Sequence, residues 1–211
     1  EFIDRNPLAS VQTPKTPTRE VRTVSFSELQ QLIGTIPTKG FTGMRDRALV
    51  VALLGTGARI SELINLRVDD VDFDAGQVRV LGKGKKERRL FMSPKVFKAM
   101  HKYWFKQRAA LPGPYFFSHI DGRPLDRWYV NHKLKKYCVR AHLRPQILSP
   151  HKLRHTYATS YLRNGGDVFT LQKILGHSTL DMSRHYAQVA DDDVERKMKQ
   201  HSPVEALQVK V

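Results

Sequence analysis

Apolar and polar residues follow two different periods along the chain, and the change of period separates helical segments from strands. Ser25 stands three residues before Glu28, which is the spacing of a helix capping box, and apolar residues then recur every three or four positions. The pattern predicts a first helix from Ser25 onward, a second over 45–54 that a Gly-Thr-Gly stop closes, and a third that begins near Ala58.

Between 71 and 92 the apolar residues alternate with polar ones, as in strands that bury one face. Two turns interrupt this alternation, Asp74-Ala75-Gly76 and the lysine-rich run Gly82-Lys83-Gly84-Lys85-Lys86. Segments separated by two short turns predict a three-stranded antiparallel sheet whose second hairpin has a lysine-rich tip.

Helical periodicity returns at Pro94, with breaks near 111–114 and 121–124. Ser149-Pro150 is a strong helix start, because Ser is a good N-cap and Pro suits the first helical position. Gly165-Gly166 is expected to end that helix.

The C-terminal region is also helical in pattern. Asp167 caps one helix, which Gly176 ends, and a further helix beginning at Ser178 or Thr179 is expected to contain Tyr186. The predicted fold class is therefore α+β, mostly helical, with one small three-stranded antiparallel sheet.

The N-terminal segment differs in composition from the rest. Residues 6–23 are rich in Pro, Thr and basic side chains and show no helical or strand period. We predict an interdomain linker over 1–24, one folded domain over 25–200 and a C-terminal tail over 201–211. A chain that opens on a linker is expected where a preceding domain has been removed.

The charge of the chain points to the kind of partner. The 211 residues include 36 Lys and Arg against 20 Asp and Glu, which gives a formal net charge of +16 and a sequence pI near 10.1. This excess favours a polyanion, with nucleic acid as the first candidate. A ribosome-associated protein or a protein of anionic membrane surfaces would share the charge. Apolar residues, at 40%, suffice for a buried core.

The sequence lacks the residues that several classes of chemistry require. Cys138 is the only cysteine, so no internal disulfide forms, and its apolar neighbours predict a packed thiol in a reducing compartment. The sequence contains no zinc-spaced Cys/His cluster, no Walker-type loop and no dinucleotide fingerprint. It has no apolar run of bilayer-spanning length. We expect chemistry by side chains alone, without a metal, a cofactor or a membrane partner.

One predicted helix start is suited to binding an anion. His151 and Arg154 are three residues apart in the first turn after Ser149-Pro150, so they share a face near free backbone N–H groups. A guanidinium, an imidazole and amides that meet at one point fit a phosphate diester. A His-x-x-Arg pair that only faces water is the commoner outcome of this spacing.

Further residues could serve the same anion. Arg59 follows the Gly-Thr-Gly break and Glu62 comes one turn later, although an ordinary surface pair has this spacing too. His177 follows a glycine helix stop, a corner where a histidine is more often a structural hydrogen-bonder. Lys83 lies between two glycines at a hairpin tip, and such lysines usually stay solvated. Tyr186 alone would be taken as half-buried packing.

Together these segments resemble the tyrosine recombinases of the phage integrase family. The resemblance lies in residue type, order and spacing over TGARISEL at 56–63, GKGKKER at 82–88, HKLRHTYAT at 151–159, LGHS at 175–178 and the final Tyr186. It extends from about 25 to 199 and depends on several separate motifs. It implies a site-specific DNA recombinase that needs neither a metal ion nor ATP.

The resemblance implies three residues that bind the scissile phosphate and one acidic residue that supports them. Arg59 and Arg154 would clamp its non-bridging oxygens, since planar guanidinium groups suit bidentate contact and stay charged. His177 would donate a further hydrogen bond to the phosphate. Glu62 would support the neighbouring arginine and histidine, at a position that is often Asp in the family.

It also implies a nucleophile and two residues that transfer protons. Tyr186 would be the nucleophile and form a covalent 3′-phosphotyrosyl link. A phenol with a pKa of about 10 is a weak nucleophile, so His151 would help to manage its proton. Lys83 would protonate the departing 5′ oxygen.

Double-stranded DNA is then the expected partner. The basic residues expected to contribute phosphate contacts are Lys85, Lys86, Arg88, Lys133, Lys135, Lys136 and Arg140. The apolar tail after Pro203 is expected either to pack on a neighbouring protomer in a synaptic tetramer or to fold back on its own domain. Accessory DNA-bending proteins and a cytoplasmic, nucleoid-associated location also follow from the resemblance.

Integration and excision of a mobile element is the favoured role, because the stretch 190–211 diverges from the rest. Chromosome dimer resolution by an Xer-type enzyme, relaxation by a type IB topoisomerase and a non-catalytic DNA-binding module are the alternatives. Family members usually carry an N-terminal domain that completes a clamp on DNA, which this sequence lacks. Nicking, relaxation or covalent attachment is therefore expected before full strand exchange.

Overall fold

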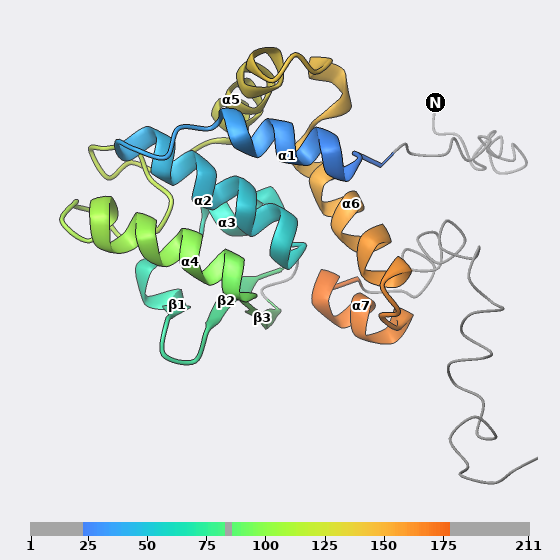
Figure 1. Ribbon diagram of the computed structural model, residues 1–211. Helices are drawn as coiled ribbons and strands as arrows, with labels where there is room; N and C mark the ends of the chain where they lie inside the picture. Colours follow the sequence, from blue (N-terminus) through green and yellow to red (C-terminus); the bar gives the residue numbers. More distant parts are fainter. Residues whose placement is uncertain (1–22, 83–85, 178–211) are drawn as a thin grey trace, which may run out of the picture.

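The computed structural model describes residues 23–82 and 86–177 (Figure 1). Its α-helices are α1 (Phe26–Thr35), α2 (Phe41–Thr56), α3 (Ile60–Ile64), α4 (Pro94–Tyr103), α5 (Arg127–Arg140), α6 (Pro150–Arg163) and α7 (Val168–Leu175). Its strands are β1 (Val71–Asp72), β2 (Gln77–Leu81) and β3 (Glu87–Phe91). The predicted fold class is confirmed. The predictions for 1–22 of the linker, the helix from Ser178 or Thr179, the C-terminal tail, Lys83, Lys85 and Tyr186 lie outside the described residues. Val24 of the predicted linker is 5% exposed and packs in the core.

Three helices begin at the predicted caps. Ser25 Oγ accepts a hydrogen bond of 3.2 Å from Glu28 N, and Glu28 Oε2 accepts one of 2.8 Å from Ser25 N, which completes the capping box of α1. Ser149 caps α6 with Pro150 in its first turn, and Asp167 caps α7. These starts are local, so the sequence alone specified them.

The sheet is antiparallel in the order β1-β2-β3, as predicted. Val78 lies opposite Leu90 and Val80 opposite Arg88. Val78, Val80 and Leu90 are buried, whereas Arg79 is exposed. Since side chains alternate between faces, Arg88 shares the inner face with Leu90.

Two helices differ in length from the prediction. α2 begins at Phe41 and not at 45, because Gly40 with a φ of 72° turns the chain and the Phe41 ring packs on Tyr103 with centroids 6.0 Å apart. α3 has only five residues, because the chain beyond it pairs with the strand-like segment around 115. Phe116 N donates to Leu66 O at 2.7 Å there.

A π-helical turn over Trp104–Arg108 extends α4 and was not predicted. The buried Arg108 guanidinium donates to the carbonyls of Leu111, Gly113 and Tyr115, so it organises the following loop. These partners satisfy a buried cation with backbone oxygens alone, which helical periodicity does not reveal.

The main core lies around α2, which packs against α4 and α6 (Figure 1). A buried polar network joins α2 to α5. Arg45 Nη2 lies 2.7 Å from Asp46 Oδ1, and the Tyr137 hydroxyl donates to Asp46 Oδ2 at 2.7 Å. Burial and the Asp46 carboxylate raise the pKa of Tyr137, so the phenol keeps the proton that it donates.

α7 is held by a separate small core. Ala158 and Leu162 of α6 and Leu171 and Leu175 of α7 form a buried cluster of their own (Figure 1). Cys138 is a buried free thiol in the main core, as predicted. Within 23–82 and 86–177, no helix has the length and apolarity needed to cross a bilayer.

Candidate active site

Arg59 and Glu62 are placed by the start of α3. Gly57 adopts the left-handed conformation with a φ of 64° and ends α2, so the chain turns sharply before Arg59. Glu62 Oε2 accepts a hydrogen bond of 2.7 Å from Arg59 N, and Glu62 Oε1 lies 3.1 Å from Arg59 Nη1. The predicted pairing of Arg59 with Glu62 is confirmed. The Arg59 side chain keeps 32% of its surface exposed, so it can still reach a ligand.

Arg154 and His177 meet on the buried side of this site. Arg154 is 4% exposed and lies one turn into α6. Its Nη2 lies 3.1 Å from His177 Nε2, and its Nη1 donates to Gly57 O at 2.7 Å. His177 follows Gly176, which has a φ of 62° and ends α7 as predicted. Two residues 23 apart in sequence thus meet beside Gly57, two residues before Arg59.

Three arginines converge on three consecutive carbonyls at the end of α7. Arg88 Nε donates to Ile174 O at 2.8 Å, Arg154 Nη2 to Leu175 O at 2.7 Å, and Arg59 Nη2 to Gly176 O at 3.2 Å. The last carbonyls of a helix have no partner within the helix and carry partial negative charge, so they suit cations. We call the backbone carbonyls of Ile174, Leu175 and Gly176 the carbonyl triplet. Their hydrogen bonds bring Arg59 and Arg154 together, as the predicted phosphate clamp requires.

The site has an excess of positive charge. Among the described residues, the guanidinium groups of Arg59, Arg88 and Arg154 meet here with a single carboxylate, that of Glu62, which leaves two positive charges in excess within this set. Burial and then the charges of Arg154, Arg59 and Arg88 lower the pKa of His177 to about 4, so its imidazole is neutral at pH 7.

Glu62 is held ionised despite its burial. Burial alone would raise the pKa of Glu62, but hydrogen bonds from Arg88 and Arg59 outweigh it and lower the pKa below its usual value. The described residues therefore form a rigid, cationic site with one neutral imidazole. Such a site can bind a phosphate diester and neutralise the charge that develops on it during displacement.

The chain matches the Phage integrase family over residues 22–193. It belongs to that family. It is 32% identical over 207 residues to tyrosine recombinase XerD of Staphylococcus haemolyticus, covering 96% of this chain and 70% of the relative. It is 35% identical over 185 residues to tyrosine recombinase XerC of Proteus mirabilis, covering 86% of this chain and 59% of the relative.

Solved structures of recombinases share the fold of this integrase-family domain. The structure of XerA recombinase aligns with a TM-score of 0.75 at 31% identity, covering 91% of this chain and 68% of that one. XerH recombinase bound to a palindromic difH substrate aligns with a TM-score of 0.70 at 25% identity, covering 87% and 53%. The domain is thus a tyrosine recombinase catalytic domain, and it spans only part of each relative.

Three candidate residues take no part in the contacts described so far. His151 is exposed at the start of α6, one turn from the buried Arg154. Lys83 and Tyr186 lie outside the described residues, so their predicted roles stay predictions. Within the described ranges, no three His, Cys, Asp or Glu side chains gather as metal ligands would.

The basic residues predicted to contact DNA divide into two sets. Lys86, Lys135, Lys136 and Arg140 are exposed, while Lys133 is half-buried with its Nζ 5.5 Å from the centre of the Tyr129 ring. Arg88 has a different position: its side chain is 13% exposed and its guanidinium binds Glu62 and Ile174. The strand period could have found this, because Arg88 is two residues from the buried Leu90.

Sequence reasoning also missed an aromatic pair on α5. Trp128 is 73% exposed, and its ring stacks on His132 with centroids 5.2 Å apart. The two are one turn apart and continue along the exposed helix face to Lys135 and Lys136. The spacing of four was visible in the sequence, but an exposed tryptophan is not expected from periodicity alone.

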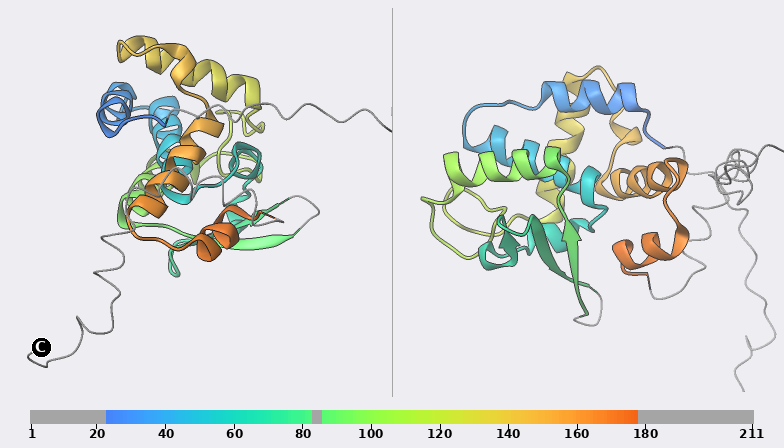
Figure 2. Two further views of the ribbon diagram at one scale, coloured as in Figure 1. Left: turned by 90° about the vertical axis from the view of Figure 1, so that its right-hand side faces the viewer. Right: turned by 60° about the horizontal axis from the view of Figure 1, so that its bottom comes forward.

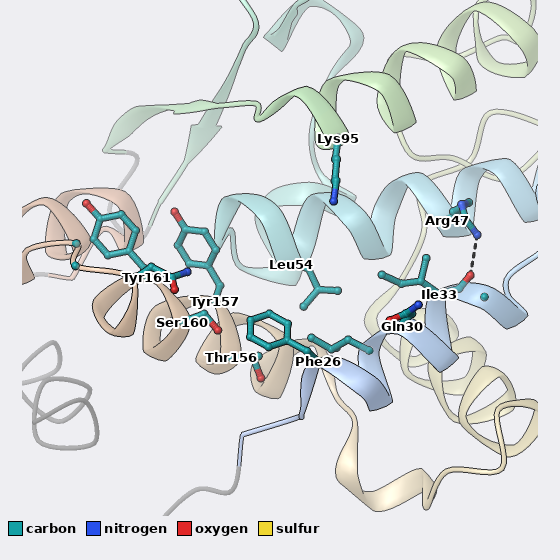
Figure 3. Close-up of a pocket in the computed structure, with 15 residues that line it drawn as sticks. Phe26, Gln30, Ile33, Arg47, Leu54, Lys95, Thr156, Tyr157, Ser160 and Tyr161 are labelled. Carbon is teal, nitrogen blue, oxygen red and sulfur yellow. Dashed lines mark hydrogen bonds between the residues drawn. The ribbon is translucent and has the colours of Figure 1, made fainter. Parts of the chain in front are cut away.

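A groove of about 1080 Å³ lies apart from these residues (Figure 3). Its lining from α1, α2, α4 and α6 mixes apolar residues, such as Phe26, Leu54 and Tyr157, with polar ones, such as Arg47 and Lys95. None of the described candidate catalytic residues lines it. Phe26 is 74% exposed.

Proposed function

We propose that this domain cuts and rejoins duplex DNA at a specific site through a covalent 3′-phosphotyrosyl link to Tyr186. The observation that carries the proposal is the convergence of Arg59, Arg154 and His177 at the carbonyl triplet, with positive charge in excess. In-line displacement at a diester creates a transition state with added negative charge, which such a site stabilises.

The proposed first step is a balanced exchange of bonds. Tyr186 Oη attacks phosphorus and loses its proton to His151, which the exposed start of α6 presents to solvent. The bond from phosphorus to the 5′ oxygen breaks, and Lys83 protonates that oxygen. Attack by the 5′ hydroxyl of another strand reverses these transfers and frees Tyr186. The phosphotyrosyl bond conserves the energy of the diester, so the joining step needs no ATP. Arg59, Arg154 and His177 neutralise the developing charge in place of a metal ion.

Arg154 and His177 would change partners when the phosphate binds. A phosphate oxygen replaces His177 Nε2 as acceptor for the Arg154 guanidinium. The His177 ring then carries its proton on Nε2 and donates to a second phosphate oxygen. Both side chains are buried in place, so the exchange of hydrogen bonds requires no large movement of either side chain.

DNA would lie across the face that α5, α3 and the β2–β3 hairpin share. Figure 2 (left) shows the start of α5 and the hairpin projecting to the same side of the domain. The exposed residues Lys86, Lys135, Lys136 and Arg140, with Lys133 and Lys85, supply phosphate contacts, and Trp128 supplies an apolar one. A DNA substrate implies work at the nucleoid in the cytoplasm, with accessory DNA-bending proteins in the assembly.

A nicked suicide duplex tests the proposal. The target sequence of this duplex is first selected from random duplexes. After cleavage, the short fragment that carries the new 5′ hydroxyl diffuses away because of the nick, so the covalent adduct accumulates. The native chain forms an SDS-stable protein–DNA adduct, and Tyr186→Phe forms none. Binding without any adduct from the native chain would instead identify a non-catalytic DNA-binding module.

Two biological roles use this chemistry. The stretch 190–211, most of which lies beyond the family match over 22–193, favours integration and excision of a mobile element. The 32% identity to XerD over 207 residues favours resolution of chromosome dimers as the second candidate. The selected DNA site separates them, because a near-palindromic site present on the host chromosome would overturn the mobile-element role.

The groove of Figure 3 is the proposed receiving surface for the C-terminal tail of a neighbouring protomer. The tail over 201–211 carries apolar residues at 204, 206, 207, 209 and 211, which suit a groove lined by Phe26, Leu54 and Tyr157. The tail lies outside the described residues. Exchange of tails would link protomers into a tetramer on DNA. In the proposed organisation, residues 1–24 form the linker and 25–200 the catalytic domain.

Substitution of the exposed Phe26 tests this exchange. Phe26→Glu and a chain truncated after Gln200 should both bind DNA yet fail to assemble tetramers on a duplex with paired sites, measured by mass photometry. Phe105→Glu is the matched control, since Phe105 is 61% exposed and does not line the groove. Normal tetramers with Phe26→Glu would mean that the tail packs elsewhere or on its own domain.

A further inference from the structure

We infer that Arg88 is a positioning residue that holds Glu62, Arg59 and the segment before His177 in their reactive arrangement, and that it does not contact DNA. The inference rests on the proposed function, since it assigns a residue to the same site. Within the described part of the chain, the Arg88 guanidinium joins the sheet to both α3 and the end of α7.

All three nitrogens of the Arg88 guanidinium have protein partners. Nη1 donates to Glu62 Oε1 and Nη2 to Glu62 Oε2, each at 2.8 Å, which is a bidentate pair. Nε donates to Ile174 O at 2.8 Å. The Arg88 side chain is 13% exposed and that of Glu62 is 3% exposed, so the pair is shielded from water.

The backbone of α7 is shaped to admit this guanidinium. A Cβ on Gly176 would lie 3.1 Å from Arg88 Nη1 and 3.2 Å from its Cζ, so the guanidinium packs directly on the glycine. Gly176 already has a positive φ of 62°. Glycine therefore meets two needs at this position, the end of α7 and the close approach of Arg88.

Arg88 positions two residues of the proposed phosphate site, Arg59 through Glu62 and His177 through Ile174. By occupying both oxygens of Glu62 it orients the carboxylate, which binds the backbone and the guanidinium of Arg59. By binding Ile174 O it fixes the chain three residues before His177. A lysine has one compact ammonium group, which cannot make these three directed contacts together.

The strand supplies a matched control. Arg89 is the next residue on β3, is exposed on the opposite face and lies across from Arg79. Arg88→Met and Arg89→Met remove the same charge from adjacent positions. A phosphate contact at either position would show as weaker DNA binding and a shallower salt dependence.

The kinetic test measures DNA affinity and the single-turnover rate of adduct formation on the selected nicked duplex. We expect Arg88→Met and Arg88→Lys to slow the step by about 10- to 100-fold, as when groups that support reacting residues are lost, with dissociation constants within about twofold of the native value. Arg89→Met should leave the rate for bound DNA unchanged. Arg88→Lys keeps a positive charge and a long aliphatic side chain, so the measurement can be made on this variant if Arg88→Met does not fold.

A titration of His177 by NMR, without DNA, gives an independent result. Loss of the neighbouring charge in Arg88→Met should raise the pKa of His177 from about 4, whereas Arg88→Lys and Arg89→Met should leave it low. If the native chain forms no adduct, the proposed function fails and this titration still decides the position of Arg88. Native rates in Arg88→Lys, or weaker DNA binding with an unchanged rate for the bound complex, would overturn the inference.

Discussion

Arg154 Nη2 donates a hydrogen bond to His177 Nε2, with 3.1 Å between the two nitrogens. A guanidinium has no acceptor, so His177 Nε2 must offer its lone pair and the ring proton must lie on Nδ1. His177 is therefore a neutral, oriented imidazole before any DNA arrives. Its tautomer and its low pKa have one cause, the burial of the ring beside arginines.

The low pKa of His177 predicts how stability depends on pH. The folded pKa of about 4 lies below the unfolded value of about 6.5, so the unfolded chain binds the extra proton between these values. Stability from this group is present above about pH 6.5 and is lost as the pH falls toward 4, by on the order of 2–3 kcal/mol. Urea unfolding from pH 7 to pH 4 should show this loss, and His177→Gln should lose less. Equal losses in both proteins would contradict a buried neutral His177.

Substitution of the two clamp arginines should abolish most activity. Arg59→Ala and Arg154→Ala each remove a guanidinium that the proposed mechanism assigns to the phosphate, so each should cost about 3 kcal/mol or more in transition-state stabilisation, or at least 10²-fold in rate. Arg154 is buried and Arg59 is not, so Arg154→Ala should also lower the free energy of unfolding. Adduct formation and urea unfolding on both variants measure the two effects. An Arg59→Ala variant with native adduct rates would remove Arg59 from the site.

Gly57 should tolerate alanine less well than Gly76 does. Both have a φ of 64°, but a Cβ on Gly57 would lie 2.4 Å from Tyr157 Cδ1, whereas nothing lies within 4 Å of a Cβ on Gly76. Gly76→Ala should cost about 1 kcal/mol from backbone strain alone, and Gly57→Ala should cost more and slow adduct formation by shifting Arg59. Urea unfolding compares the two. Equal losses would show that the Tyr157 ring moves aside freely.

Removal of Asp46 should destabilise the domain strongly. Asp46→Ala leaves the buried Arg45 without its carboxylate and Tyr137 without its acceptor, and breaking a buried pair costs about 3–5 kcal/mol. The exposed Arg123–Asp121 pair is the control, since Asp121→Ala should cost less than about 1 kcal/mol. The difference in the urea midpoint of unfolding measures both. A small effect at Asp46 would mean that water reaches Arg45.

Adduct formation should not depend on a divalent metal ion. The proposed chemistry assigns charge neutralisation to Arg59 and Arg154 and protonation of the leaving group to Lys83, so each task that a metal could perform has a side chain. The suicide-duplex reaction should keep its full rate in a chelator. Strict dependence on magnesium would count against the mechanism.

Local features of the chain were predictable from the sequence. The caps at Ser25, Ser149 and Asp167, the glycine stops and the three strands depend on neighbours a few residues away, and the structure confirms them. The candidate residues were recognisable because their types and order resemble those of a known family. The groups that surround each candidate residue in the folded domain were not recognisable from the sequence.

Only the tertiary structure decided how these residues meet. Arg59 binds a carbonyl 117 residues away and Arg154 one 97 residues away, and no periodic pattern encodes such a distance. The sequence therefore placed Arg88 among the surface cations, while packing set it between Glu62 and the end of α7. Local pattern determines which face of an element a side chain takes. Long-range packing determines what that face meets, because it depends on every other element at once.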